Sequence, residues 1–164
     1  MKYDKDGMGT HSTMDEGYDF YVTDKHNKKY HFKIGSFSIH SHMFYEALEV
    51  VEKGSDVEPH VFHMLADVDG DPEHAEYLLK AKIKKGIDRR YLEFRDGEPS
   101  LRMDKDELFG RIDYSKDLSD TEFNTIFIID GKRITVEQFL NMLDPYTGFN
   151  FKLSIHDLCD DLPD

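Results

Sequence analysis

The stretch that decides the fold runs from Asn124 to Ile155 and reads NTIFIIDGKRITVEQFLNMLDPYTGFNFKLSI. Its first part, Thr125 to Ile129, is a short apolar run rich in β-branched residues, which is typical of a strand covered on both faces. Asp130 and Gly131 follow, and glycine readily adopts the positive φ that a tight turn requires. This part of the chain therefore predicts a buried strand that ends in a tight turn.

A helix is predicted shortly after the turn, from Val136 to Leu143. Thr135 and Gln138 have the spacing of a capping box, in which each side chain accepts a backbone N–H that the start of the helix leaves unpaired. Apolar residues then recur at helical spacing, and Pro145 and Gly148 end the pattern.

The end of the stretch predicts a further strand, from Phe149 to Ile155. Apolar and polar residues alternate there, and the apolar ones are Phe149, Phe151, Leu153 and Ile155. A period of two is typical of a strand with one buried face.

The N-terminal half of the chain adds more strand patterns and one ambiguous segment. Tyr18 to Val22 and Tyr30 to Ile34 alternate on either side of a polar turn, which predicts a β-hairpin. After Gly35 the apolar residues fall on the other parity, and a β-bulge is the simplest cause. His60 to Ala66 is a strand candidate. Met43 to Lys53 suits both helix and strand, and its spacing favours a helix slightly.

A second helix is predicted from Pro72 to Lys85. Asp71 is a standard N-cap, and proline is favoured at the first helical position. Glutamates at the start and lysines at the end complement the helix dipole, and Gly86 is the expected C-cap. Short strands are expected at Tyr91 to Phe94 and at Leu108 to Tyr114.

Together these elements predict a single α+β domain over residues 17–156. Its core would be a mostly antiparallel sheet, a meander of about six to eight strands, with the two helices packed on it. Residues 1–16 are polar without an apolar period and predict a mobile N-terminal tail. Residues 157–164 predict an acidic C-terminal tail.

Composition restricts the partners. The chain has 21 Lys and Arg against 34 Asp and Glu, a net charge of −13, so repulsion from phosphates argues against nucleic acid or an anionic membrane. No apolar run is long enough to span a membrane, and the N-terminus lacks the apolar part of a signal peptide. We therefore expect a cytoplasmic protein. The single cysteine, Cys159, has acidic neighbours that disfavour its thiolate, which predicts an inert residue.

Five segments of the chain each carry a different short motif: Phe62 to Asp71, Leu79 to Leu92, Phe109 to Tyr114, Ile128 to Lys132 and Gly148 to Leu153. They comprise a strand and helix, a Gly-Arg-Ile strand, an Ile-Asp-Gly turn with a short helix, and a Gly-aromatic-x-Phe strand. In these motifs the chain resembles an uncharacterised bacterial family of unknown function, over about two-thirds of its length. The resemblance implies no activity. It does imply a strand at Met43 to Glu52, and we adopt that assignment.

Two sets of residues are candidate metal ligands. Asp67, Asp69 and Asp71 follow a strand, and carboxylates two apart can hold Mg²⁺ or present a nucleophile. They superficially resemble the Asp-x-Asp motif of haloacid-dehalogenase-like phosphatases, but Asp71 stands where Thr or Val is expected. We therefore favour an acidic loop that caps a helix. His40 and His42 would place two imidazoles on one side of a strand, but no third ligand is identifiable.

A basic island lies between acidic stretches, from Lys80 to Arg95. Lys84, Arg89 and Arg90 in this island are candidates for contact with an acidic partner or nucleic acid. The alternative, a solvated helix end whose lysines favour the helix dipole, is the interpretation we prefer.

No catalytic constellation emerges, and no cofactor is expected. The favoured function is a non-enzymatic interaction or accessory module that binds an unknown protein through a sheet edge or its acidic surface. An edge strand would also allow a homo-oligomer. Two alternatives stay open: a metal-dependent hydrolase or phosphoryl-transfer enzyme that uses the acidic loop, and an acidic decoy that mimics DNA.

Overall fold

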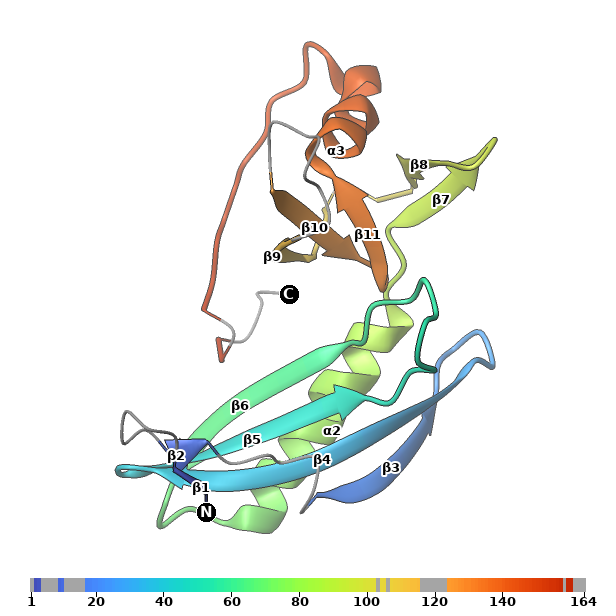
Figure 1. Ribbon diagram of the computed structural model, residues 1–164. Helices are drawn as coiled ribbons and strands as arrows, with labels where there is room; N and C mark the ends of the chain where they lie inside the picture. The colour runs from blue at the N-terminus through green and yellow to red at the C-terminus, as the bar shows by residue number, and fades with distance from the viewer. Residues whose placement is uncertain are drawn as a thin grey trace. The chain divides into compact units, whose positions relative to one another are not determined.

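The computed structural model describes residues 2–3, 9–10, 17–102, 104–105, 107–115, 124–157 and 159–160. The fold is α+β, as the sequence predicts, but the sheet is split (Figure 1). In the part that the structure describes, nine strands form three antiparallel sheets instead of one meander, and β1 (Lys2–Tyr3) pairs with β2 (Gly9–Thr10). Most of the two predicted tails lies outside the described residues.

The chain divides into two compact units. The first unit comprises Met1–Val51, Pro59–Asp88 and Ile155–Asp164, and the second comprises Glu52–Glu58 and Arg89–Ser154. The single domain that the sequence predicts over residues 17–156 includes most of both.

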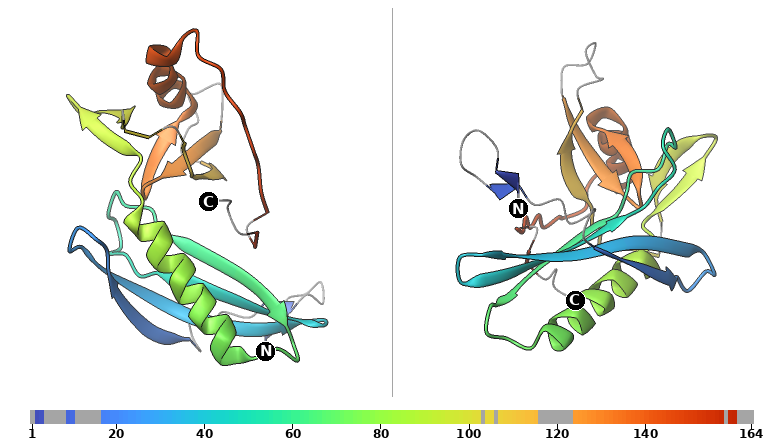
Figure 2. Two further views of the ribbon diagram at one scale, coloured as in Figure 1. Left: turned by 180° about the vertical axis from the view of Figure 1, so that it is seen from behind. Right: turned by 60° about the horizontal axis from the view of Figure 1, so that its bottom comes forward.

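A four-stranded antiparallel sheet forms the first unit, with strand order β3-β4-β5-β6. The strands are β3 (Tyr18–Thr23), β4 (Lys29–Ile39), β5 (His42–Glu49) and β6 (Val61–Asp67). The helix α2 (Pro72–Asp88) lies along one face of this sheet, as both views of Figure 2 show. Its buried side chains are Ala75, Leu79, Ile83 and Ile87, and they pack on Tyr30, Phe32, Ile34, Tyr45 and Ala47. The predicted hairpin is confirmed, and Met43 to Glu49 is strand.

The expected end of α2 at Gly86 is wrong, because the helix continues to Asp88. A Cβ added at Gly86 would meet the ring of Phe62 on β6. This glycine therefore serves a close approach of helix and sheet and not a C-cap, which explains why it is found inside a helix despite its low propensity.

The expected bulge at Gly35 is also wrong. β4 pairs with β5 in unbroken register from Phe32 to Ile39. The change of parity has another consequence: Ile34 faces α2, whereas Phe37 lies on the opposite face, where its ring is 5.0 Å from that of Phe44. The apolar side chains of β4 therefore change from one face of the sheet to the other along the strand, while the pairing of β4 with β5 is unbroken.

The second unit contains two small antiparallel sheets. In one, β7 (Leu92–Arg95) pairs with β8 (Glu98–Leu101). In the other, β9 (Arg111–Tyr114), β10 (Thr125–Ile129) and β11 (Lys132–Thr135) are arranged in the order β11-β10-β9. The helix α3 (Val136–Leu143) follows β11 directly, and the short 3-10 helix η1 (Asp144–Tyr146) follows α3. The buried residues of this unit's core are Tyr91, Leu92, Ile129, Ile134 and Met142.

The predicted tight turn and capped helix are confirmed. Asp130 and Gly131 have φ of 50° and 70° and join β10 to β11. The side chain of Thr135 accepts the N–H of Gln138, and the side chain of Gln138 accepts the N–H of Thr135. Both bonds of the capping box are therefore present, and α3 has the predicted bounds.

The predicted strand from Phe149 to Ile155 is wrong. This segment has no strand assignment, and its alternating apolar side chains are exposed, with Phe149 at 72% and Phe151 at 92%. The physical reason is that alternation specifies which face of a strand is apolar, whereas a strand also needs a neighbour to accept its hydrogen bonds. Within the described residues no neighbouring strand pairs with this segment.

Candidate functional site

The acidic loop of the sequence prediction lies between β6 and α2. Asp67 ends β6, and its carbonyl oxygen accepts the N–H of Gly70 in a turn at 3.0 Å. Asp71 accepts the N–H of Glu73 on its Oδ1 at 3.0 Å, which confirms its role at the start of the helix. Asp67, Asp69 and Asp71 are all exposed.

The structure separates the two candidate histidine ligands. His40, with φ of 52°, lies in the two-residue turn that joins β4 to β5, whereas His42 begins β5. His42 is directly opposite Asp67 on β6 and shares a hydrogen bond with the Ser41 hydroxyl. The expectation of two imidazoles on one side of a strand is therefore wrong. Among the residues that the structure describes, no group of three or more His, Cys, Asp or Glu could hold a metal ion.

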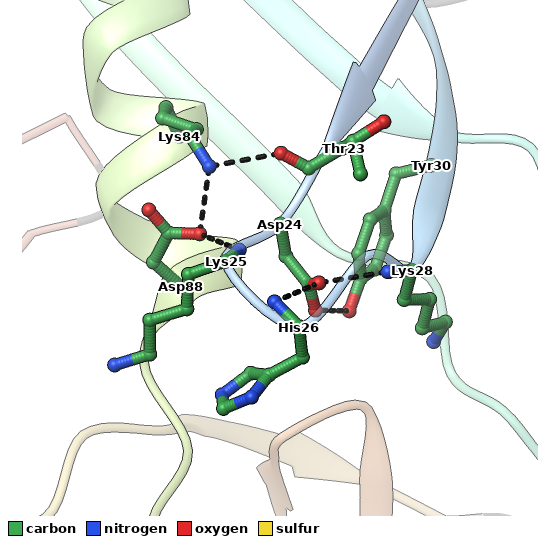
Figure 3. Close-up of polar contacts among 8 residues, drawn as sticks. All are labelled: Thr23, Asp24, Lys25, His26, Lys28, Tyr30, Lys84 and Asp88. Atoms are coloured by element: carbon green, nitrogen blue, oxygen red, sulfur yellow. Dashed lines mark hydrogen bonds and ion pairs between the residues drawn. The ribbon is translucent and has the colours of Figure 1, made fainter.

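Two of the basic candidates, Lys84 and Arg89, make contacts within their own units. Lys84 donates to the carbonyl oxygen of Thr23 at 2.8 Å and to Asp88 at 2.9 Å, and Asp88 also accepts the N–H of Lys25 (Figure 3). Lys84 thus ties the β3–β4 turn to the end of α2.

In the second unit, the guanidinium of Arg89 lies over the ring of Phe109, 4.7 Å from its centroid. Arg90 also has an interaction partner. Lys84, Arg89 and Arg90 therefore do not form a cluster of unengaged cations of the kind that binds phosphates.

The β3–β4 turn in Figure 3 contains a buried carboxylate, that of Asp24. Its Oδ1 accepts the N–H groups of His26 and Lys28, at 2.8 and 2.9 Å, and its Oδ2 accepts the Tyr30 hydroxyl at 3.4 Å. These bonds satisfy the carboxylate locally, which is the usual structural role of an aspartate in a turn.

A carboxylate–imidazole pair that the sequence did not indicate lies at the end of the same sheet. Glu49 is buried, and its Oε2 accepts both Nδ1 of His60, at 2.6 Å, and the His60 N–H, at 3.0 Å. Burial raises the pKa of the Glu49 carboxyl, but these hydrogen bonds and the charge of His60 outweigh it and lower the pKa below its ordinary value.

Such a pair can orient an imidazole as a general base, provided that a nucleophile lies within reach. In the described part of the chain no hydroxyl or thiol hydrogen-bonds to the His60 ring, whose neighbours are the aromatic rings of Tyr30 and Phe62. Within the described residues the pair therefore has no nucleophile beside it, and its hydrogen bonds join β5 to the residue that precedes β6.

The second unit has an open sheet edge. β9 is the last strand in the order β11-β10-β9. The N–H of Ser115 donates to the carbonyl oxygen of Asn124, on the side of β10. Backbone groups alternate in direction along a strand, so those of Ile112 and Tyr114 point away from the sheet. The N–H of Tyr114 is held by the side chain of Asp113 at 2.8 Å. Among the described residues no strand pairs with this outer edge.

Apolar side chains are exposed beside the open edge. Ile112 is directly opposite Phe127 of β10, and Phe127 stacks on Phe139 of α3 with ring centroids 4.3 Å apart, so Ile112 and Tyr114 lie on the face that carries α3. The helix is short and packs on β10 and β11, which leaves Ile112 57% and Tyr114 61% exposed. On α3 itself, two apolar residues are also exposed: Leu140 and Leu143.

We call this set the apolar edge surface: the outer edge of β9 with Ile112 and Tyr114. Single exposed apolar residues are ordinary, but apolar residues gathered beside an unpaired strand edge are typical of an interaction site. The sequence signal for it was present in the alternation of apolar and polar residues along β9.

No helix among the described residues is long and apolar enough to cross a membrane. No curated protein and no solved structure matches the chain.

Two family models match, each over one part of the chain. A domain of unknown function, DUF7686, matches residues 15–88, the range that contains the four-stranded sheet and α2. A second domain of unknown function, DUF7713, matches residues 91–160, the range that contains the apolar edge surface and the segment from Phe149 to Ile155. Together the two matches cover residues 15–160, so the chain is similar to these two uncharacterised domains arranged in tandem.

Proposed function

We propose that the protein is a non-enzymatic interaction module, in the cytoplasm, that binds a partner protein through the apolar edge surface of its second unit. The observation that carries the proposal is the exposure of Ile112 and Tyr114 beside an edge of β9 with which no strand among the described residues pairs. Burying one large apolar side chain contributes about 1.5 to 3 kcal/mol, so covering these two would support stable binding.

The chemistry of the edge indicates the kind of partner. The outward backbone groups of β9 suit an extended strand, which would add to the sheet by main-chain hydrogen bonds. Its alternate side chains would have to be apolar to pack on Ile112 and Tyr114. The net charge of −13 further favours a protein partner over nucleic acid.

Affinity capture from the source cell tests the proposal with a matched pair of variants. Ile112→Asp places a charge in the apolar edge surface, whereas Tyr77→Asp places the same charge on α2 at a side chain that is 68% exposed. We expect the wild type and Tyr77→Asp to capture the same partner and Ile112→Asp to lose it. Equal capture by all three proteins would contradict the proposal.

A further inference from the structure

The open edge of β9 has a matching strand in the same chain. The segment Gly148–Ser154 belongs to the second unit and follows α3 and η1. Phe149, Phe151 and Leu153 alternate with polar residues, and all three are exposed. We propose that this segment docks on the outer edge of β9 of its own chain as a fourth strand, and that, if the proposed function holds, it competes there with the partner's strand.

The direction of the chain suits an antiparallel pairing. β9 and β11 run the same way, since both pair antiparallel with β10. Figure 1 shows that α3 lies beyond the end of β11 and that the chain then returns in the opposite sense. The returning segment therefore meets β9 antiparallel, the arrangement of every other pair in this sheet.

The faces also match. Ile112 and Tyr114 are exposed on the α3-bearing face, and Arg111 and Asp113 lie on the other. A docked strand with its phenylalanines on the α3-bearing face would cover Ile112 and Tyr114, while its polar residues would lie beside Arg111 and Asp113. A shift by one residue would reverse the faces, so only registers two residues apart remain.

Charge selects between these registers. When Phe151 is opposite Tyr114 and Leu153 is opposite Ile112, Lys152 is opposite Asp113, an attractive cross-strand pair. A shift by two residues in one direction places Lys152 opposite Arg111, which is repulsive, and a shift in the other direction places both phenylalanines beyond Tyr114, the last residue of β9. We therefore assign the first register.

Docking must displace one local bond. Asp113 Oδ1 accepts the outward N–H of Tyr114 at 2.8 Å, and its Oδ2 accepts from Arg111 at 3.3 Å. In the assigned register a carbonyl of the segment replaces the Asp113 carboxylate at the Tyr114 N–H, and Lys152 becomes a second cation beside that carboxylate. The number of bonds to the Tyr114 N–H is unchanged, and the apolar side chains are buried in addition.

The same chain is favoured over a second copy as the occupant. Only η1 and Thr147 separate α3 from Gly148, whose φ of 92° permits a sharp change of direction. A short tether gives an effective concentration in the millimolar range, whereas a second copy, which carries the same net charge of −13, is repelled. Strand and edge also lie within the range of one family model, residues 91–160.

Disulfide formation in the full chain tests the pairing of this segment with β9. The variants also carry Cys159→Ser, so that only the introduced cysteines can react. Asp113 and Lys152 would form a non-hydrogen-bonded pair with Cα atoms about 4.5 Å apart, a distance that a disulfide spans. Asp113→Cys/Lys152→Cys should therefore form an intrachain disulfide under mild oxidation. The matched variant Arg111→Cys/Lys152→Cys places the thiols diagonally, beyond about 7 Å, and should form about tenfold less.

Each outcome has one meaning, once circular dichroism shows that both variants fold. Predominant intrachain disulfide in the first variant supports the docked strand, and reduction should then restore capture that oxidation had lowered. Interchain disulfide would overturn the proposal in favour of a second copy, disulfide mainly in the matched variant would overturn the register, and free thiols in both would overturn docking altogether. Normal capture by a protein without the disulfide would overturn the docked strand and leave the proposed function standing. A variant that forms the disulfide but captures no partner when reduced would support the docked strand and contradict the proposed function.

Discussion

At the scale of single residues, the buried Glu49 shows how one side chain can couple stability to pH. Its carboxylate accepts two hydrogen bonds from His60, which lie at 2.6 and 3.0 Å. Because the pKa of Glu49 is lowered in the folded protein, the pair stabilises the fold above the unfolded pKa of about 4.3. This contribution is lost as the pH falls through the lowered pKa.

We therefore expect Glu49→Gln to lower the free energy of unfolding at pH 7 by about 1 to 2 kcal/mol, since a neutral amide is the weaker acceptor. The difference from wild type should shrink as the pH falls below about 4. Urea unfolding at pH 7 and at pH 3 measures both effects. The control is Glu52→Gln, the same change at an exposed position. An equal effect of both variants at pH 7 would contradict the account.

Variants of the aspartates between β6 and α2 distinguish a structural role of these residues from a role as metal ligands. Asp71→Ala should lower the free energy of unfolding by about 1 kcal/mol, because the N–H of Glu73 loses its acceptor. Asp67→Asn and Asp69→Asn should leave it nearly unchanged. Thermal unfolding with and without Mg²⁺, Ca²⁺ or Mn²⁺ is the measurement. A rise in Tm with metal that Asp67→Asn abolishes would instead establish an acidic-loop metal site.

At the scale of elements, the capped helix α3 was predictable to the residue, because its signals are local. Thr135→Ala removes one bond of the capping box and should lower the free energy of unfolding by about 1 kcal/mol. Thr135→Ser keeps the hydroxyl and serves as the control. Equal loss in both variants would show that the methyl group, and not the cap, is responsible.

The glycine inside α2 gives a prediction opposite to the usual one. Gly→Ala inside a helix ordinarily stabilises by about 1 kcal/mol, but at Gly86 the new Cβ meets the Phe62 ring. We expect Gly86→Ala to destabilise by about 1 to 3 kcal/mol through overpacking. The double variant Gly86→Ala/Phe62→Leu should cost less than the two single changes added together. Additive costs, measured by chemical denaturation, would argue against the close approach.

What the sequence could not predict depends on partners that lie far away in the chain. The pattern from Phe149 to Ile155 predicts a strand, which is wrong, because alternation cannot state which strand, if any, is its neighbour. The Glu49–His60 pair joins the last residue of β5 to the residue before β6 and leaves no local signature. His40 occupies a turn with positive φ, a position for which Asn or Gly is the usual signal. The N-terminal hairpin and the N-caps of the two helices were therefore readable, and the site geometry was not.

At the scale of the whole molecule, two models of uncharacterised domains match the chain in tandem, over residues 15–88 and 91–160. In the first, the candidate site residues are engaged in turns, caps and helix contacts. The second match contains the outer edge of β9, with which no described strand pairs, and the apolar alternation from Phe149 to Leu153. The interaction surface that we propose therefore belongs to the second domain.

Amide hydrogen exchange of the full-length protein, alone and with its captured partner, tests this account most directly. In the free protein we predict slow exchange at alternate amides of residues 149–154 and at the outward amides of Ile112 and Tyr114, because the docked strand protects both. Binding of the partner should release residues 149–154 to fast exchange while Ile112 and Tyr114 stay protected. Fast exchange of residues 149–154 in the free protein, with no change at Ile112 and Tyr114 when the partner binds, would contradict it.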